Sequence, residues 1–133
     1  MIQEPHPAPS ATWSPDMEFV LTFNQPQAVY DYNYAPATSA EGLKPWHLYI
    51  EAMMAAGIVR ACQALDVHSA TRVSVREGKR LVQDGPFADT KDLLGGFVMI
   101  DVPSLDDALQ WAERAPCSLV GCTEVFALRT PGK

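Results

Sequence analysis

The sequence predicts a single α+β domain in which an antiparallel sheet carries two helices on one face. Three observations support this fold class. The chain has 133 residues, a length that suits one domain with its own core. Short runs of β-branched and aromatic residues alternate with two stretches of helical periodicity. Glu77-Gly78, set between two strand-like runs, marks a tight hairpin, because glycine supplies the positive φ that such a turn needs.

Composition narrows the classes of partner. Hydrophobic residues make up 47% of the chain, which is ordinary for a globular protein with a core. The net charge is −6, and an acidic surface disfavours nucleic acid, whose phosphates require clustered Lys and Arg. The densest basic group lies in residues 72–80 and is interrupted by Glu77, as on the solvated side of a hairpin. We therefore expect no nucleic-acid partner.

Cysteine usage and the N-terminal segment indicate a cytoplasmic protein. Cys62, Cys117 and Cys122 have no framework spacing, so we expect reduced thiols. No apolar run approaches the roughly 20 residues needed to span a bilayer, so no membrane association is expected. Residues 1–16 contain four prolines and lack the basic start and apolar run of a signal peptide. We expect an extended or disordered N-terminal segment there, followed by one domain over residues 17–130.

The first half of the chain predicts one strand, one long loop and one helix. Residues 19–23, FVLTF, are short, β-branched and aromatic, and predict the first strand. Residues 25–42 predict a loop, whose three alternate tyrosines either close over a ligand or pack on the surface or on a partner subunit. A helix is expected from Pro45, which suits the first helical position, to Gly57, which suits the C-terminal cap. His47 borders the buried face of this helix.

The second half of the chain predicts five strands and a second helix. The strands are expected at residues 58–65, 71–75, 80–83, 94–102 and 123–128. The run at 94–102 is nearly all apolar in its second half, which is typical of a central strand. Ser104 begins the helix, with Asp107 at the capping-box position, and Pro116 ends it.

The order of these elements indicates the topology. With the hairpin taken as an insertion, the remaining elements follow the order βαββαβ of a ferredoxin-like fold, an antiparallel sheet with two helices on one face. The other face of the sheet must be covered. In a chain this short a second copy is the simplest cover, so we expect a symmetric homodimer that packs sheet against sheet.

Three segments carry a resemblance to a known family. They are VREGKRLVQ, DGPFADTK and LLGGFVMIDVPSLDDALQWAERAP. Together they closely resemble the YCII-related family, specifically its DGPF branch, and the similarity covers nearly the whole chain from Met17. The resemblance implies a ferredoxin-like protomer and a dimeric α/β-barrel assembly. It also implies an active-site pair made of a helix His and the Asp of the DGPF turn, and some relatives are linked with extracytoplasmic-function sigma factors.

On this resemblance Asp84 matches the motif Asp, and His47 is the counterpart of the helix His. Asp84 has two interpretations. Its carboxylate can accept hydrogen bonds from nearby backbone N–H groups and hold the turn, which requires no catalysis. Alternatively it is partly buried against Phe87 and acts as a general base or orients a His. The sequence leaves both interpretations open.

His47 also has two interpretations. Histidine titrates near neutral pH, so a His47–Asp84 pair would move a proton to or from a small substrate, whereas a helix-border His that hydrogen-bonds Glu51 or water needs no function. His68, in the turn after the second strand, either approaches the same pocket or is an exposed loop residue. We predict Asp84 and His47 as catalytic residues. The predicted substrate-binding residues are His68, Gly85, Pro86 and Phe87.

No signature of a metal or cofactor is present. His47, His68 and Asp84 lack the close spacing of metal ligands, and the sequence has no phosphate-binding loop or dinucleotide fingerprint, so neither a metal nor a cofactor is expected. Two functional hypotheses follow. The first is a cofactor-independent small-molecule enzyme or ligand-binding dimer, with lyase- or isomerase-type acid/base chemistry. The second is a non-catalytic regulatory or protein-binding dimer, associated with sigma-factor-linked transcription control.

Overall fold

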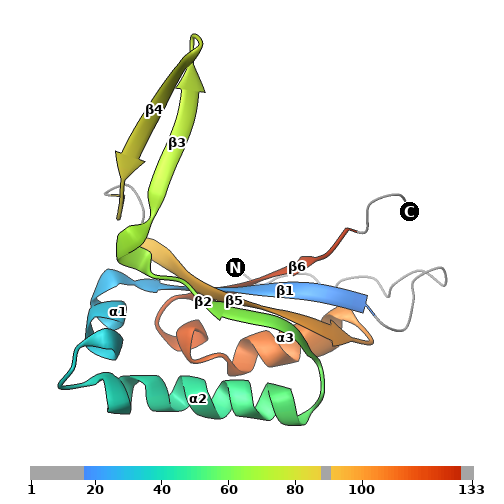
Figure 1. The fold of residues 1–133 in the computed structure, drawn as a ribbon. Helices are drawn as coiled ribbons and strands as arrows, with labels where there is room; N and C mark the ends of the chain where they lie inside the picture. The colour runs from blue at the N-terminus through green and yellow to red at the C-terminus, as the bar shows by residue number, and fades with distance from the viewer. Residues whose placement is uncertain (1–16, 88–90, 130–133) are drawn as a thin grey trace.

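The computed structural model describes residues 17–87 and 91–129, in which helices pack beneath an antiparallel sheet (Figure 1). The extended or disordered N-terminal segment expected at residues 1–16 lies outside the described residues. The sheet has four strands in the order β2-β5-β1-β6, and each neighbouring pair is antiparallel. The strands are β1 (Met17–Pro26), β2 (Val59–Ala64), β5 (Asp92–Val102) and β6 (Cys122–Ala127). This order is that of a ferredoxin-like βαββαβ fold, so the predicted fold class is confirmed.

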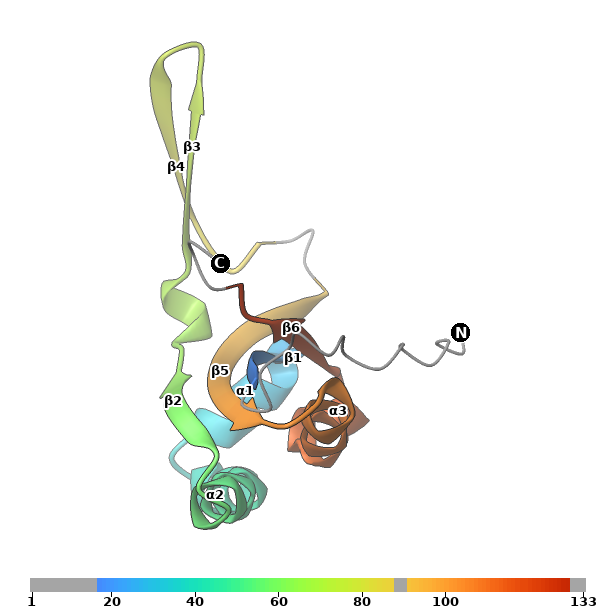
Figure 2. The ribbon, with the colours of Figure 1, turned by 90° about the vertical axis from the view of Figure 1, so that its right-hand side faces the viewer.

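One face of the sheet is covered by α2 (Ser39–Ala55) and α3 (Leu105–Arg114), which lie side by side beneath it (Figure 2). Alternate residues of β1 and β5 enter this core, while the residues between them face the other way. The largest fully buried side chains are Phe19, Leu21, Met53, Val98, Ile100 and Cys117. Among the described residues, no helix is long and apolar enough to cross a membrane.

The prediction of a loop over residues 25–42 is wrong in its first part, because these residues form the helix α1 (Gln27–Tyr34). In a helix, alternate residues are turned by about 200° from each other, so the three tyrosines do not share a face. Tyr30 is buried, whereas Tyr32 and Tyr34 are exposed. The alternate spacing of the tyrosines therefore concealed the helix. Packing of Tyr30 against the rest of the fold stabilises α1 more than the intrinsic helix propensity of its residues does.

The helix α2 begins at Ser39, earlier than the start predicted at Pro45, which lies inside the helix. Proline removes one backbone hydrogen bond there, which is why the local pattern favoured a start at this residue. The added turns pack against α1. Gly42 lies so close to α1 that a Cβ at this position would be 2.9 Å from the Asn33 Cα atom. Contact between the two helices thus extends α2 beyond its local signal.

The C-terminal end of α2 and both ends of α3 follow the prediction closely. Gly57 has a φ of 71° and follows the last turn of α2, as a C-terminal cap requires. The Ser104 hydroxyl oxygen accepts a hydrogen bond from the Asp107 N–H at 3.2 Å and donates to Asp107 Oδ2 at 2.9 Å. Pro116 begins the short 3-10 helix η2 (Pro116–Leu119) directly after α3.

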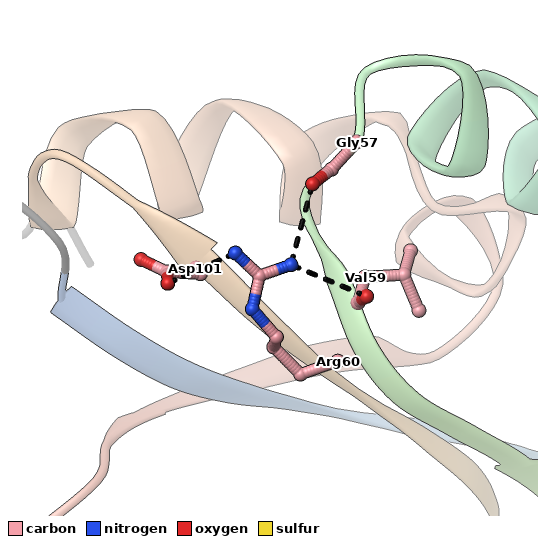
Figure 3. Close-up of polar contacts among 4 residues, drawn as sticks. All are labelled: Gly57, Val59, Arg60 and Asp101. Atoms are coloured by element: carbon pink, nitrogen blue, oxygen red, sulfur yellow. Dashed lines mark hydrogen bonds and ion pairs between the residues drawn. The ribbon is translucent and has the colours of Figure 1, made fainter.

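An arginine holds the start of β2 against β5 (Figure 3). The β2–β5 register shifts between Val59 and Ala61, where Arg60 lies. The Arg60 Nη2 donates to Asp101 Oδ2 at 3.0 Å, and Nη1 donates to the carbonyls of Gly57 and Val59 at 3.3 and 3.4 Å. The charge-assisted contact fixes this edge of the sheet.

The predicted hairpin is present as β3 (Thr71–Arg76) and β4 (Lys79–Asp84), joined to β2 through the 3-10 helix η1 (Val67–Ser69). Its turn has φ values of 53° at Glu77 and 76° at Gly78, the two positive angles of a type I′ turn. We call residues 71–84 the arm. Figures 1 and 2 show the arm rising from the sheet on the side opposite α2 and α3.

The replacement Gly42→Ala should destabilise the protein, although alanine is the better helix former by about 1 kcal/mol. The new methyl group meets the backbone and side chain of Asn33, and overpacking of this kind costs ~1–3 kcal/mol. The free energy of unfolding in urea measures the effect. Ala40→Gly, at an exposed position of the same helix, reports the propensity effect alone. A Gly42→Ala protein more stable than wild type contradicts the proposed helix–helix contact.

Candidate functional site

A cavity of about 330 Å³ lies at one end of the sheet, between α1, α2 and the strands β1, β2 and β5. Seven of its fifteen lining residues are large aromatic or aliphatic residues: Phe23, Tyr30, Tyr34, Leu43, Trp46, Ile50 and Phe97. The remaining lining residues are Gln25, Asn33, His47, Cys62, Gln63, Ala64, Gly95 and Gly96. No Lys, Arg, Asp or Glu of the described chain lines the cavity. Such a site suits a small, mainly apolar molecule with few polar groups.

Burial distinguishes the floor of the cavity from its mouth. The floor is formed by buried residues, including Phe23 and Tyr30 and two buried amide side chains, Gln25 and Asn33. The mouth is formed by exposed residues: Tyr34, His47, Cys62, Gln63 and Ala64. The floor thus combines apolar rings with two amide groups, and the mouth is open to solvent.

Tyr30 sets the position of the floor. Its hydroxyl donates to the Leu93 carbonyl at 2.6 Å, and its ring lies against Gly95, where a Cβ would overlap the ring. The β1–β5 register shifts after Phe23, and this bulge leaves Gly95 without a paired residue. Burial raises the pKa of Tyr30 to about 12, and hydrogen bonds with Gln25 act in the opposite direction. The hydroxyl therefore stays protonated and serves as a structural donor.

An aromatic wall closes the side of the cavity. The Trp46 ring meets the Phe23 ring edge to face, with centroids 4.9 Å apart, and Tyr49 lies 6.1 Å from both. The Tyr49 hydroxyl donates to the Trp111 carbonyl of α3 at 2.7 Å, and burial raises the pKa of Tyr49. The aromatic wall is therefore connected to α3 as well as to the sheet.

Of the six predicted site residues, His47 is the one that lines the cavity in the described part of the chain. It follows Trp46 on α2, and its side chain is exposed at the cavity mouth. The side chain of His47 makes no hydrogen bond with the side chain of Glu51 or with any other residue that the structure describes. The imidazole nitrogen atoms are therefore accessible to a molecule in the cavity.

Asp84 does not lie at the cavity of its own chain. It is the last residue of β4, at the base of the arm, and it pairs across the hairpin with Thr71. Its side chain is exposed, and its carboxylate accepts no hydrogen bond from the residues that the structure describes. It is not among the cavity-lining residues. Residues 17–87 and 91–129 of one chain thus do not bring Asp84 and His47 together in the cavity, and their pairing stays a prediction.

The rest of the motif forms a compact turn at the base of the arm. The Gly85 N–H donates to the Ala70 carbonyl at 2.6 Å, and a Cβ on Gly85 would be 3.0 Å from that oxygen. The Phe87 ring lies under the Arg72 guanidinium, with its centroid 3.8 Å from the Arg72 Cζ atom. Gly85, Pro86 and Phe87 are half-buried but do not line the cavity of their own chain.

His68 is an exposed residue of η1. Its Nε2 lies 3.1 Å from Asp31 Oδ1 of α1, and both side chains are about half exposed. His68 does not line the cavity either. In this structure it links η1 to α1 on the surface, while its role in substrate binding stays a prediction.

Sequence reasoning missed the cavity residues on α1 and β2. Tyr30 and Asn33 were placed in a loop, so their shared helical face was not seen. The helical spacing of Tyr30, Asn33 and Tyr34 was the available signal. Partial desolvation at the cavity mouth raises the pKa of the Cys62 thiol, which therefore stays protonated and is a poor nucleophile at neutral pH. Within residues 17–87 and 91–129, no group of three or more His, Cys, Asp or Glu side chains could hold a metal ion.

Comparison with known proteins identifies a family and a relative. The model of a family described as the YCII-related domain matches residues 17–130. A stretch of 35 residues is 57% identical to the uncharacterized protein R00369 of Rhizobium meliloti (strain 1021). This second match covers 26% of the chain and spans 28% of that protein's length.

The replacement Tyr30→Phe should lower the free energy of unfolding by ~1–3 kcal/mol, because the buried Leu93 carbonyl loses its donor. It should also reduce the loss of stability at alkaline pH. In the folded state the pKa of Tyr30 is raised from 10.0 to about 12. The neutral form therefore favours folding below about pH 10, and this contribution disappears as the pH rises through about 12.

Urea unfolding between about pH 9 and about pH 12 measures this difference. Tyr32→Phe, on the exposed face of the same helix, should keep the wild-type pH dependence. An equally steep alkaline loss in Tyr30→Phe contradicts the assignment of that loss to Tyr30.

Proposed function

The protein belongs to the YCII-related family, and we propose that it binds a small, mainly apolar molecule in the cavity and exchanges a proton with it through His47. One observation carries the proposal: a histidine stands at the mouth of an aromatic-walled cavity that no Lys, Arg, Asp or Glu of the described chain lines. The D-G-P-F stretch at residues 84–87 supports assignment to the DGPF branch of the family.

The size of the cavity limits the ligand. An apolar cavity of ~150 Å³ holds one benzene molecule, and drug-sized sites begin at ~300 Å³. The volume of about 330 Å³ therefore suits a molecule of one or two rings. Its ring system would contact Phe23 and Trp46, while a carbonyl or hydroxyl group would bond to Gln25 or Asn33.

The chemistry available to His47 is acid/base catalysis. Neutral imidazole removes a proton from a ligand carbon beside a carbonyl group, and the resulting imidazolium returns a proton to another position of the same molecule. This isomerisation balances without a co-reactant, since the proton lost at one position is replaced at the other. The exposed position of His47 lets its proton also exchange with water.

We further propose a homodimer in which a second copy covers the open face of the sheet. Val20 on β1 pairs in register with Met99 on β5 and Phe126 on β6, so the three side chains share that face. Phe126 is 51% exposed, and covering this apolar row would stabilise the assembly. The predicted partnership of Asp84 with His47 would then require either a movement of the arm or a contribution from the second copy.

A deuterium-exchange experiment tests the proposal. Monocyclic and bicyclic aromatic ketones are first screened for binding by thermal shift; a ligand at one hundred times its Kd adds ~2.7 kcal/mol of stability. Bound ketones are then incubated with the protein in deuterated water, and NMR follows deuterium at the carbon beside the carbonyl. His47→Gln should slow this exchange by at least ~100-fold while leaving binding largely intact.

Control variants locate the reaction in the cavity. Ala64→Trp, at the cavity mouth, should abolish both binding and exchange, whereas Ala55→Trp, exposed on α2 away from the cavity, should change neither. Binding that survives Ala64→Trp shows that the ligand sits elsewhere. Binding without any exchange supports the alternative function, a regulatory dimer that holds an effector in the same cavity.

The role of Asp84 requires a double-mutant cycle. Asp84→Asn, His47→Gln and the double variant are compared in the same exchange reaction, since residues that act as a pair are non-additive by 0.5 kcal/mol or more. If Asp84 assists His47, the double variant should be no slower than His47→Gln alone. Additive effects would show that Asp84 acts independently of His47.

A further inference from the structure

The two faces of the arm differ in chemistry. Residues directly opposite each other in a strand pair share a face, and the register sets Val73 opposite Val82 and Val75 opposite Arg80. One side of the arm, which we call the valine face, therefore comprises Thr71, Val73, Val75, Arg80, Val82 and Asp84. Its three valines are between 51% and 61% exposed. The opposite face carries Arg72, Ser74, Arg76, Lys79, Leu81 and Gln83.

The valine face has the pattern of a buried surface. Valines alternate with polar residues along Thr71–Arg76. This alternation is typical of a strand whose one face packs against protein while its other face is exposed to water. In the described residues the arm forms a two-stranded sheet of its own, separate from the main sheet. A two-stranded hairpin alone in water is marginally stable. Packing of the valine face against another surface would supply the missing stabilisation.

The direction of the arm indicates what covers the valine face. The arm rises on the side of the open sheet face, opposite α2 and α3 (Figures 1 and 2). Each of its strands has six residues and is therefore ~20 Å long at ~3.3 Å per residue, whereas packed sheets lie ~10 Å apart. A second copy seated on the open face would thus lie beside the arm, which is long enough to pass the edge of the second sheet.

Charge favours the same occupant. The arm carries four basic and two acidic residues, while the rest of the chain carries six basic and fourteen acidic residues. Glu18 and Glu124 are exposed on the open face, where they alternate with the core-facing residues of β1 and β6. A basic arm on an acidic body attracts another copy of the same chain and repels neither its own nor the partner's body.

We propose that the arm is a dimerisation clasp whose valine face packs along the edge of the second copy's sheet. Two-fold symmetry places the second copy's arm on the first copy in the same way. This inference rests on the homodimer proposed above and adds the surface that holds it. Because Asp84 shares the valine face, it lies at the boundary between the two copies.

The test removes the apolar character of the valine face without changing its shape. Threonine is nearly isosteric with valine and keeps its β propensity, so the combined variant Val73→Thr, Val75→Thr, Val82→Thr preserves the hairpin. We expect it to raise the dimer dissociation constant, measured by analytical ultracentrifugation, by at least about tenfold. Leu81→Thr, on the opposite face of the arm, should change the constant by less than about twofold.

A second pair of variants tests the charge. Arg80 lies on the valine face and Lys79, its neighbour, lies on the opposite face. Arg80→Glu should weaken the dimer by about tenfold or more, because it places a negative charge against the acidic partner, and Lys79→Glu should have a much smaller effect. Equal effects of the two reversals contradict docking through the valine face.

The outcomes separate the clasp from the dimer itself. A wild-type protein that is monomeric at about 100 μM overturns both proposals, because an interface whose dissociation constant exceeds this concentration does not hold a stable dimer. A dimer whose dissociation constant is unchanged by the three threonines overturns the clasp and leaves the sheet-to-sheet dimer standing. Hydrogen exchange gives an independent measure: the amides of β3 and β4 should gain protection on dimerisation, and unchanged protection overturns the clasp.

Discussion

The seating of Tyr30 on Gly95 is the contact on which the candidate site depends. The β5 bulge leaves room for the ring, and the hydrogen bond to the Leu93 carbonyl fixes its depth. That contact holds α1 against the sheet. The first turns of α2 in turn rest on α1 where Gly42 meets Asn33, and His47 follows on the same helix. The absence of a Cβ atom at Gly95 on β5 therefore helps to determine the position of His47 relative to the cavity.

The sheet separates two surfaces with different chemistry. Residues that alternate along β1 and β5 point either to the helices, where they form the core and the cavity floor, or to the open face. The cavity lies on the helical side between α1, α2 and the strand ends. The arm rises on the other side (Figure 1). The proposed ligand site and the proposed association surface therefore lie on opposite faces of the same sheet.

Elements with strong local signals were predictable from the sequence. Glu77-Gly78 requires positive φ values and therefore marks the turn of the arm, and Ser104 with Asp107 marks the start of α3. The helix α1 and the early start of α2 were not predictable in this way. Their local signals are weak or opposed by Pro45, and they depend on contacts with β5 and with each other.

The sequence by itself determined the family, the βαββαβ order and the identity of the motif at residues 84–87. It also singled out His47, which lies at the cavity mouth. The tertiary structure alone decided which other residues join His47 there: Tyr30, Gln25 and Asn33 come from segments whose proximity depends on a bulge in a distant strand. It also decided that Asp84, at the end of the predicted hairpin, does not line the cavity of its own chain, because the place of the arm relative to the sheet depends on contacts across the chain and not on any short motif.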